Sequence, residues 1–214
     1  MELYPIFLNL KDKKCLVVGG GKVAERKVSA LARCGAQIHV ISPQLTAELQ
    51  NMVECGLIKH RHGYYETSDL ADAFLVISAT NNEAANHTVA NDCMQRNIMV
   101  NVVDDPPRCN FFVPSVVHRG SLKLAVSTGG SSPRLARMIR QKLEQEFGTA
   151  FTEFTNFLGA IRRQVREQVT NTAKREQILK DLVDETTFAM VAQGDLERAK
   201  ERVNNVCRIN RCQS

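Results

Sequence analysis

Short apolar runs alternate with longer amphipathic segments over the first half of the chain. The runs occur at residues 15–18, 38–41, 57–60, 74–78 and 98–103. Between them lie three segments long enough for helices, at residues 23–34, 45–55 and 84–96. Strands that alternate with helices in this way are typical of a parallel sheet covered by helices. The pattern therefore predicts a doubly wound α/β fold for this part of the chain.

The pattern changes beyond residue 112. Residues 121–127 place Leu122, Leu124 and Val126 on one face, which predicts a strand with one buried side. A Gly- and Ser-rich loop follows, in which Ser132 suits the N-cap position of a helix. Pro133 suits the first helical position. This helix has apolar residues at a spacing of four, namely Leu135, Ile139, Leu143 and Phe147.

The rest of the chain has helical patterns. An apolar stripe runs from Phe151 to Val165, and further helices are expected at 174–192 and 195–207 with a break at Gly194. The chain therefore divides into three predicted sections, which are a nucleotide-binding domain at 1–112, a small linking region at 113–148 and a helical domain at 149–214.

A glycine motif lies directly after the first apolar run and directly before the first predicted helix. The segment Gly19-Gly20-Gly21-Lys22-Val23-Ala24 fits the pattern G-x-G-x-x-A. In this position glycines permit a tight turn, and the helix N-terminus offers N–H groups to a pyrophosphate. The motif predicts a dinucleotide site that involves Gly19, Gly21, Lys22 and Val23, with a turn required only for packing as the alternative.

Two further turns are expected to complete this site. Ser42, Pro43 and Gln44 follow the second run and should line the adenosine side. Neither a carboxylate for a ribose 2′-hydroxyl nor an Arg for a 2′-phosphate is present there, and NAD is the better expectation than NADP. Thr80 and Asn81 follow the fourth run and should lie near the ribose or the nicotinamide.

Composition restricts the class of protein. Hydrophobic residues make up 43% and charged residues 24% of the 214 residues, which is ample for a packed core. No apolar run approaches the roughly 20 residues of a membrane span, and the N-terminus does not resemble a secretory leader. Seven scattered cysteines without a CxxC pair indicate a reducing compartment, with pairing or metal binding by Cys207 and Cys212 as a weaker alternative. We therefore expect a cytoplasmic protein.

The positive charge is concentrated in one short section. The net charge is +5, and residues 113–148 hold 6 basic and 2 acidic residues, a balance of +4. This distribution favours binding of an anionic ligand over non-specific binding of nucleic acid, and the chain has no nucleic-acid-binding motif.

Four ordered motifs resemble a known family. They are PIFLNLKDKKCLVVGGGKVAERK, ISATNN, NVVDDPPRCNFFVPS and AVSTGGSSPRLAR. Over residues 3–147 the chain resembles the precorrin-2 dehydrogenase/sirohydrochlorin ferrochelatase family, including the N-terminal module of siroheme synthase. The resemblance is only architectural over the helical tail.

The resemblance implies an NAD-binding Rossmann domain, a dimerisation region at 113–148 and a helical domain, assembled as a homodimer. It implies NAD⁺-dependent oxidation of precorrin-2, a tetrapyrrole, to sirohydrochlorin. Some members also insert Fe²⁺ as a substrate metal and others only dehydrogenate, and the sequence leaves both open. The region of siroheme synthase that the chain resembles does not include the methyltransferase module, which lies downstream. We therefore expect a separate protein to methylate the precursor.

The family motif NVVD points to Asp104 as a catalytic residue. Asp104 follows the fifth run at the carboxyl edge of the predicted sheet, where a carboxylate can serve as general base or accept pyrrole protons during metal insertion. A simple Asp-Asp-Pro-Pro turn is the alternative. His118, beside Arg119, is a second candidate for proton transfer, although a lone histidine is more often structural.

The Ser-rich loop and the helix after it are candidates for substrate binding. Ser127, Ser131 and Ser132 offer hydroxyl groups at a helix N-terminus, and Arg134 and Arg137 begin a basic face. A tetrapyrrole polycarboxylate, expected from the family, would account for this charge. The alternative for this helix is that it is solvated at a dimer interface. For the protein as a whole, the alternative from a different functional class is a sensor of NAD that binds a partner protein.

Overall fold

A five-stranded parallel sheet forms the centre of the first of two compact units, Met1–Val113 and Pro114–Ser214. The computed structural model describes residues 2–212, with side chains to residue 208. The strands are β1 (Lys14–Val18), β2 (Gln37–Ser42), β3 (Lys59–His62), β4 (Leu75–Ser78) and β5 (Met99–Val102), arranged in the order β3-β2-β1-β4-β5. This order confirms the predicted doubly wound α/β fold.

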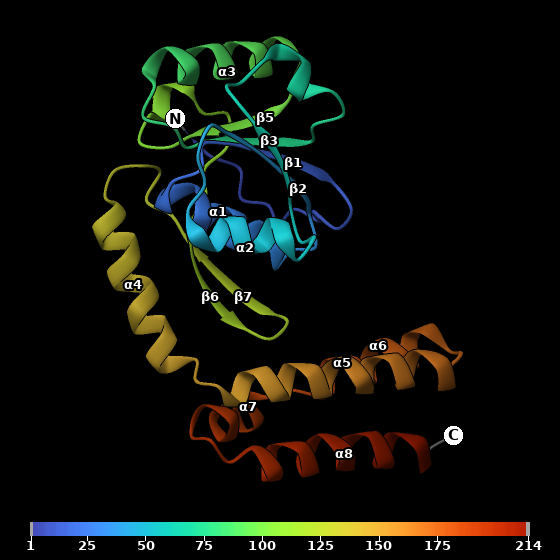
Figure 1. The fold of residues 1–214 in the computed structure, drawn as a ribbon. Helices are drawn as coiled ribbons and strands as arrows, with labels where there is room; N and C mark the ends of the chain where they lie inside the picture. Colours follow the sequence, from blue (N-terminus) through green and yellow to red (C-terminus); the bar gives the residue numbers. More distant parts are fainter. Residues whose placement is uncertain (1, 213–214) are drawn as a thin grey trace. The chain divides into compact units, whose positions relative to one another are not determined.

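Helices cover both faces of this sheet (Figure 1). Cys15 and Val17 of β1 pack in a core with α1 (Lys22–Ala32) and α2 (Ala47–Glu54). The alternate residues Leu16 and Val18 face the other core, to which α3 (Glu83–Gln95) contributes. Two short 3₁₀ helices, η1 (Thr67–Leu70) and η2 (Pro106–Arg108), lie in the loops after β3 and β5. Strands β1, β4 and β5 are buried on both faces, which is why their sequences are almost continuously apolar, whereas the edge strand β3 is polar and partly exposed.

The second unit begins with a two-stranded antiparallel hairpin, β6 (Ser115–Arg119) and β7 (Leu122–Val126). Its turn includes Gly120 at φ 61°. Helix α4 (Pro133–Glu146) follows, and the side-chain hydroxyl of Ser132 accepts a hydrogen bond from the Leu135 N–H at 3.2 Å, as the predicted N-cap. Arg119 connects the hairpin to the end of α4 by donating hydrogen bonds to two backbone carbonyls, those of Glu144 and Phe147.

Four helices complete the second unit (Figure 1). They are α5 (Ala150–Gln168), α6 (Thr172–Asp181), α7 (Glu185–Ala192) and α8 (Leu196–Cys212). Their core contains Phe151, Phe154, Ile161 and Val165 of α5, which confirms the predicted apolar stripe. Cys207 is buried in the same core, whereas the side chain of Cys212 lies outside the described residues.

Three details of the expected elements were wrong. The predicted helix at 174–192 is two helices, α6 and α7. The second begins after Asp184, whose side chain caps it by accepting a hydrogen bond from the Thr187 N–H. Strand β6 was not predicted. The third strand begins at Lys59 rather than at residue 57, because Gly56 is in the left-handed region at φ 69° and Leu57 lies in the turn. No helix among the described residues is long and apolar enough to cross a membrane.

Candidate functional site

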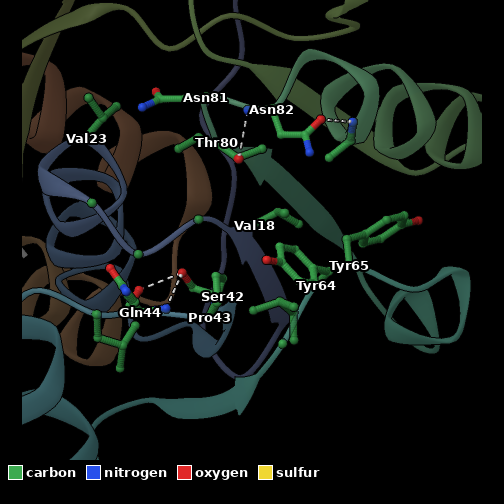
Figure 2. A pocket seen from close by; sticks show the side chains of 18 of the residues that line it. Val18, Val23, Ser42, Pro43, Gln44, Tyr64, Tyr65, Thr80, Asn81 and Asn82 are labelled. Atoms are coloured by element: carbon green, nitrogen blue, oxygen red, sulfur yellow. Dashed lines mark hydrogen bonds between the residues drawn. The ribbon is translucent and has the colours of Figure 1, made fainter.

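A cleft of about 780 Å³ opens at the carboxyl ends of the strands in the first unit (Figure 2). It lies where the strand order reverses, since β1 pairs with β2 on one side and with β4 on the other. Its walls come from the loops after β1, β2 and β4 and from residues 63–65 after β3. Open α/β sheets bind their ligands at such a switch point.

The three glycines after β1 have different surroundings. Gly19 has a φ of 118°, and a β-carbon there would lie 2.3 Å from the backbone oxygen of Ala79. A β-carbon on Gly20 would lie 1.9 Å from the backbone oxygen of Gln44. A β-carbon on Gly21 would meet nothing within 4 Å. The first two glycines therefore permit close packing of the loops, whereas Gly21 leaves open space in front of α1.

The N-terminus of α1 faces this space without a capping side chain. The first N–H groups of such a helix need an acceptor, and a pyrophosphate can supply one. Lys22 is the one charged side chain among the described residues that line the cleft. Its ammonium group pairs with the Glu25 carboxylate at 3.0 Å. Hydrogen bonds from the Thr46 hydroxyl and then from Lys22 lower the pKa of Glu25.

The turn after β2 is held rigidly at one side of the cleft. The Ser42 hydroxyl donates a hydrogen bond of 2.6 Å to the backbone oxygen of Gln44, and the Gln44 N–H returns one of 3.3 Å. The Thr46 N–H donates to the carbonyl of Gly20 at 3.0 Å. Because these bonds use backbone groups and a buried hydroxyl, the shape of this wall is set before a ligand binds.

The turn after β4 is fixed in a similar way at the other side of the cleft. The Thr80 hydroxyl accepts a hydrogen bond from the Asn82 N–H at 3.1 Å. The Asn86 amide donates to the Thr80 carbonyl at 3.1 Å, and the Ser78 hydroxyl donates to the Asn86 side-chain oxygen at 2.7 Å. Asn86 of α3 therefore holds the turn that presents Thr80 and Asn81 to the cleft.

The structure brings together all nine residues that the sequence placed at the cofactor. Gly19, Gly21, Lys22, Val23, Ser42, Pro43, Gln44, Thr80 and Asn81 all line the cleft. Their arrangement suits a dinucleotide, with an uncapped helix N-terminus between two preformed turns. Sequence reasoning missed Gly63, Tyr64 and Tyr65, although two aromatic residues directly after a strand at this sheet edge were a usable signal.

Asp104 lies in the turn after β5, with an exposed side chain. Its φ of 61° is in the left-handed region, which is uncommon for residues other than glycine and tolerated best by Asn and Asp. Asp105 forms an ion pair with Arg108. Lys27 of α1 has its pKa lowered mainly by burial, and the charge of Asp104 acts in the opposite direction. Asp104 does not line the cleft described above, so its catalytic role stays a prediction.

The other predicted site residues belong to the second unit. His118 is an exposed residue of β6. Ser127 and Ser131 are exposed in the loop before α4, while Ser132 is partly buried as its N-cap. The last two, Arg134 and Arg137, are exposed on α4. Among the described residues no group of three or more His, Cys, Asp or Glu side chains is placed to hold a metal ion.

The fold and the cleft define an NAD(P)-binding α/β protein, and comparisons with known proteins agree. Residues 6–115 match a family model described as putative NAD(P)-binding. Residues 119–146 match the central region of a sirohaem biosynthesis protein, and residues 150–205 match the sirohaem synthase dimerisation region.

Individual relatives extend the match along the chain. It is 38% identical over 206 residues, 96% of its length, to siroheme synthases of Methylobacillus flagellatus and of Photobacterium profundum. The chain spans 44% of the length of each of these relatives. A solved structure of SirC, a precorrin-2 dehydrogenase, superposes with a TM-score of 0.81 at 26% identity and covers 96% of this chain and 100% of SirC. The chain belongs to the family formed by precorrin-2 dehydrogenase and the corresponding part of siroheme synthase.

Proposed function

We propose that this protein oxidises precorrin-2 to sirohydrochlorin with NAD⁺, as a step of siroheme biosynthesis. The observation that carries the proposal is the preformed dinucleotide cleft in a chain that matches SirC, a precorrin-2 dehydrogenase, over nearly its whole length. The match to siroheme synthases supports the same substrate.

The reaction removes two electrons and two protons from precorrin-2. A hydride passes to the nicotinamide of NAD⁺ to give NADH, and one proton goes to a base. On this chain, the turn with Thr80 and Asn81 would orient the nicotinamide half, and the first turn of α1 would hold the pyrophosphate. We propose that the Asp104 carboxylate takes the proton, because it is exposed at the carboxyl edge of the sheet in a left-handed backbone conformation.

NAD is proposed over NADP on the basis of charge. A 2′-phosphate needs a cationic partner, and the turn after β2 offers Ser42, Pro43 and Gln44 instead. Lys22 lies at the N-terminus of α1, where the pyrophosphate is expected, and is already paired with Glu25. The 2′-phosphate would therefore add negative charge without a matching side chain.

The second unit is proposed to bind the substrate and to form the dimer. Ser127, Ser131, Arg134 and Arg137 are exposed at the start of α4, where they can hold substrate carboxylates. His118 remains a further candidate for proton transfer. A homodimer is supported by the match of residues 150–205 to a dimerisation region, and a cytoplasmic location is proposed with the siroheme pathway.

The direct test is an assay of the purified protein with precorrin-2. With NAD⁺ we expect equal amounts of NADH and sirohydrochlorin, and with NADP⁺ a lower kcat/KM. Formation of sirohydrochlorin at the rate of the protein-free control would contradict the proposal. Retention of NAD⁺ binding without turnover would instead favour a sensor of NAD.

Insertion of Fe²⁺ into sirohydrochlorin is the second candidate activity, favoured by the siroheme synthases among the relatives. The metal is a substrate in this reaction, and its insertion releases two pyrrole protons that Asp104 could accept. The test adds Fe²⁺ or Co²⁺ to sirohydrochlorin without oxygen and follows the absorption spectrum. A rate above the uncatalysed background supports a bifunctional enzyme, and a rate equal to it leaves a dehydrogenase only.

A further inference from the structure

The segment after β3 places an exposed aromatic ring at the cleft. Tyr64 lines the cleft, and 76% of its surface is exposed to solvent. The ring therefore gains little from packing in the described structure, whereas a planar ligand could cover it. Gly63, at φ 127°, provides the change in chain direction that brings this residue to the edge of the cleft.

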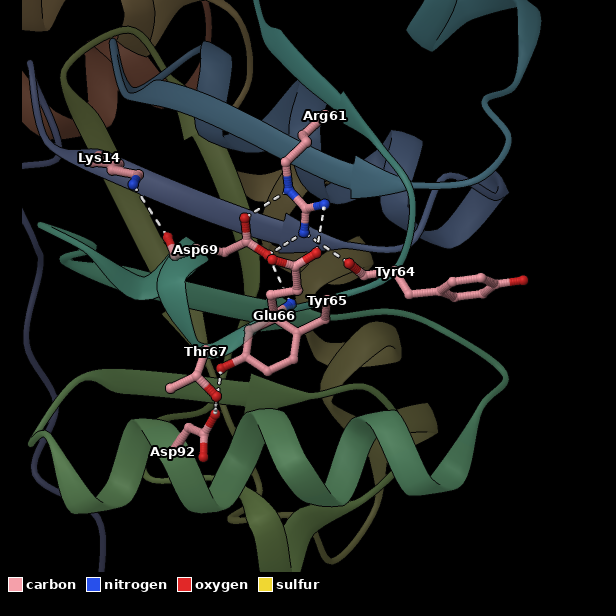
Figure 3. Close-up of polar contacts among 8 residues, drawn as sticks. All are labelled: Lys14, Arg61, Tyr64, Tyr65, Glu66, Thr67, Asp69 and Asp92. Carbon is pink, nitrogen blue, oxygen red and sulfur yellow. Dashed lines mark hydrogen bonds and ion pairs between the residues drawn. The ribbon is translucent and has the colours of Figure 1, made fainter.

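An ion-pair network fixes the backbone beneath the ring (Figure 3). The Arg61 guanidinium donates a hydrogen bond of 2.7 Å to the backbone carbonyl of Tyr64. It is itself held by the Asp69 carboxylate, with Nε to Oδ1 at 2.8 Å, and by Glu66 at 3.6 Å. The same hydrogen bond to Asp69 raises the pKa of Arg61. In Figure 3 the Tyr64 side chain points away from this network.

The next residues are fixed as well. The Tyr65 hydroxyl donates a hydrogen bond of 2.8 Å to Asp92 of α3, and the Thr67 hydroxyl donates one of 2.7 Å to the same carboxylate. The Glu66 N–H donates to Asp69 at 2.8 Å. The loop that carries Tyr64 is therefore anchored to β3, η1 and α3, and its aromatic ring is presented by a rigid backbone.

The position of the ring indicates which half of a dinucleotide it meets. Strand β3 pairs with β2, and both lie on the opposite side of β1 from β4. The turn after β2 is where this fold holds the adenosine ribose, while Thr80 and Asn81 after β4 face the other half. Apart from Lys22 at the N-terminus of α1, the described residues that line the cleft are uncharged, and Ile41 and Pro43 from the end of β2 and the turn after it are among them. A flat, neutral purine suits such a surface.

We propose that Tyr64 is the stacking platform for the adenine ring and that Arg61 is the residue that positions it through the Tyr64 carbonyl. The inference rests on the proposed NAD site and not on the identity of the oxidised substrate. Arg61 itself is a poor partner for a 2′-phosphate, because Asp69 and Glu66 already oppose its charge.

Binding of cofactor fragments tests the platform without turnover. We expect Tyr64→Ala to weaken NAD⁺ and ADP-ribose binding roughly tenfold in calorimetry, which is the typical effect of losing one base–aromatic stack. Tyr64→Phe should bind within about twofold of the wild type, since it keeps the ring. Nicotinamide mononucleotide should bind all three proteins equally. The matched control is Tyr4→Ala, which removes an exposed tyrosine that does not line the cleft.

Fluorescence gives a second reading of the same contact. The chain has no Trp and three Tyr, so its ultraviolet emission comes from Tyr4, Tyr64 and Tyr65. ADP-ribose should quench this emission in the wild type. Tyr64→Phe, which should bind within about twofold of the wild type, should show less quenching when saturated with ADP-ribose. Equal quenching in Tyr64→Phe and the wild type would contradict stacking on Tyr64.

A double-mutant cycle tests the role of Arg61. Arg61→Gln should weaken ADP-ribose binding by a few-fold and leave nicotinamide mononucleotide unaffected, and adding it to Tyr64→Ala should cause no further loss. Additive losses, or equal losses for both fragments, would overturn the positioning role. Wild-type affinity for ADP-ribose in Tyr64→Ala overturns the platform alone. Failure of the wild-type protein to bind NAD⁺ overturns the proposed function too.

Discussion

A β-carbon on Gly20 would lie 1.9 Å from the backbone carbonyl oxygen of Gln44, so the glycine loop and the turn after β2 pack backbone against backbone. One residue further, Gly21 has no neighbour within 4 Å of the same position. The two adjacent glycines therefore have different functions. Gly20 permits the cleft to form, and Gly21 keeps it open for a ligand.

Alanine at these two positions should separate folding from cofactor binding. Gly20→Ala is expected to lower the free energy of unfolding by about 1–3 kcal/mol, the usual cost of forcing atoms into a packed site, and to abolish NAD⁺ binding. Gly21→Ala should cost about 1 kcal/mol or less as an N-cap change, yet weaken NAD⁺ binding at least tenfold. Thermal denaturation and calorimetry measure both effects. Wild-type NAD⁺ affinity in Gly21→Ala would show that the space in front of α1 is not the cofactor site.

The left-handed backbone at Asp104 allows a clean test of its carboxylate. Asp104→Asn keeps a residue type that tolerates this conformation and removes only the charge. We expect a loss of kcat for precorrin-2 oxidation of roughly a hundredfold or more, with NAD⁺ affinity and thermal stability unchanged. Asp105→Asn, which breaks the ion pair with Arg108, is the matched control and should retain activity. Full activity of Asp104→Asn would remove this residue from the mechanism.

Asp184 should make stability depend on pH. Hydrogen bonds from Arg202, followed by those from Thr187, lower its pKa in the folded protein. Because the pKa is lowered on folding, the ionised carboxylate stabilises the fold at pH values above the ordinary carboxyl pKa. This stabilisation is lost as the pH falls below roughly 4. Asp184→Asn keeps a good N-cap but loses the ion pair, so its Tm should be a few degrees below wild type at neutral pH and approach it in acid. A Tm difference that is constant with pH would contradict this role.

One face of α4 should contribute to the dimer. Leu135, Met138 and Ile139 are exposed on this helix, 37–49% by surface, at the spacing of one helical face. Of the predicted apolar face, Leu135 and Ile139 are exposed, whereas Phe147 packs against the helical core. Met138→Glu should shift the protein toward monomer in light scattering at micromolar concentration, while Gln141→Glu, an equal change of charge on the same helix, should not. A dimer that is unaffected by Met138→Glu would place the interface elsewhere.

The sheet and the cofactor turns could be predicted because their signals are local. Buried parallel strands are continuous apolar runs, and the motif at Gly19–Ala24 identifies a strand–turn–helix unit without further context. The match to an NAD(P)-binding family model and the strand order of the sheet confirm what these local patterns predicted.

The elements that were missed depend on tertiary contacts. The break before Asp184 arises from a cap supported by Arg202, 18 residues away in the sequence. Strand β6 has mixed exposure, and its partner is β7. The segment around Tyr64 is held at the cleft by hydrogen bonds that involve Arg61, Asp69 and Asp92, and such tertiary contacts leave no local pattern in the sequence.

The most direct test of the central claim is a single-turnover reaction of precorrin-2 with NAD⁺, in which NADH and sirohydrochlorin are measured together. We predict that the wild-type protein forms the two products in equal amounts and that Gly21→Ala forms both more slowly at the same subsaturating NAD⁺ concentration. Sirohydrochlorin formed without NADH, or at equal rates with and without the protein, would contradict the assignment.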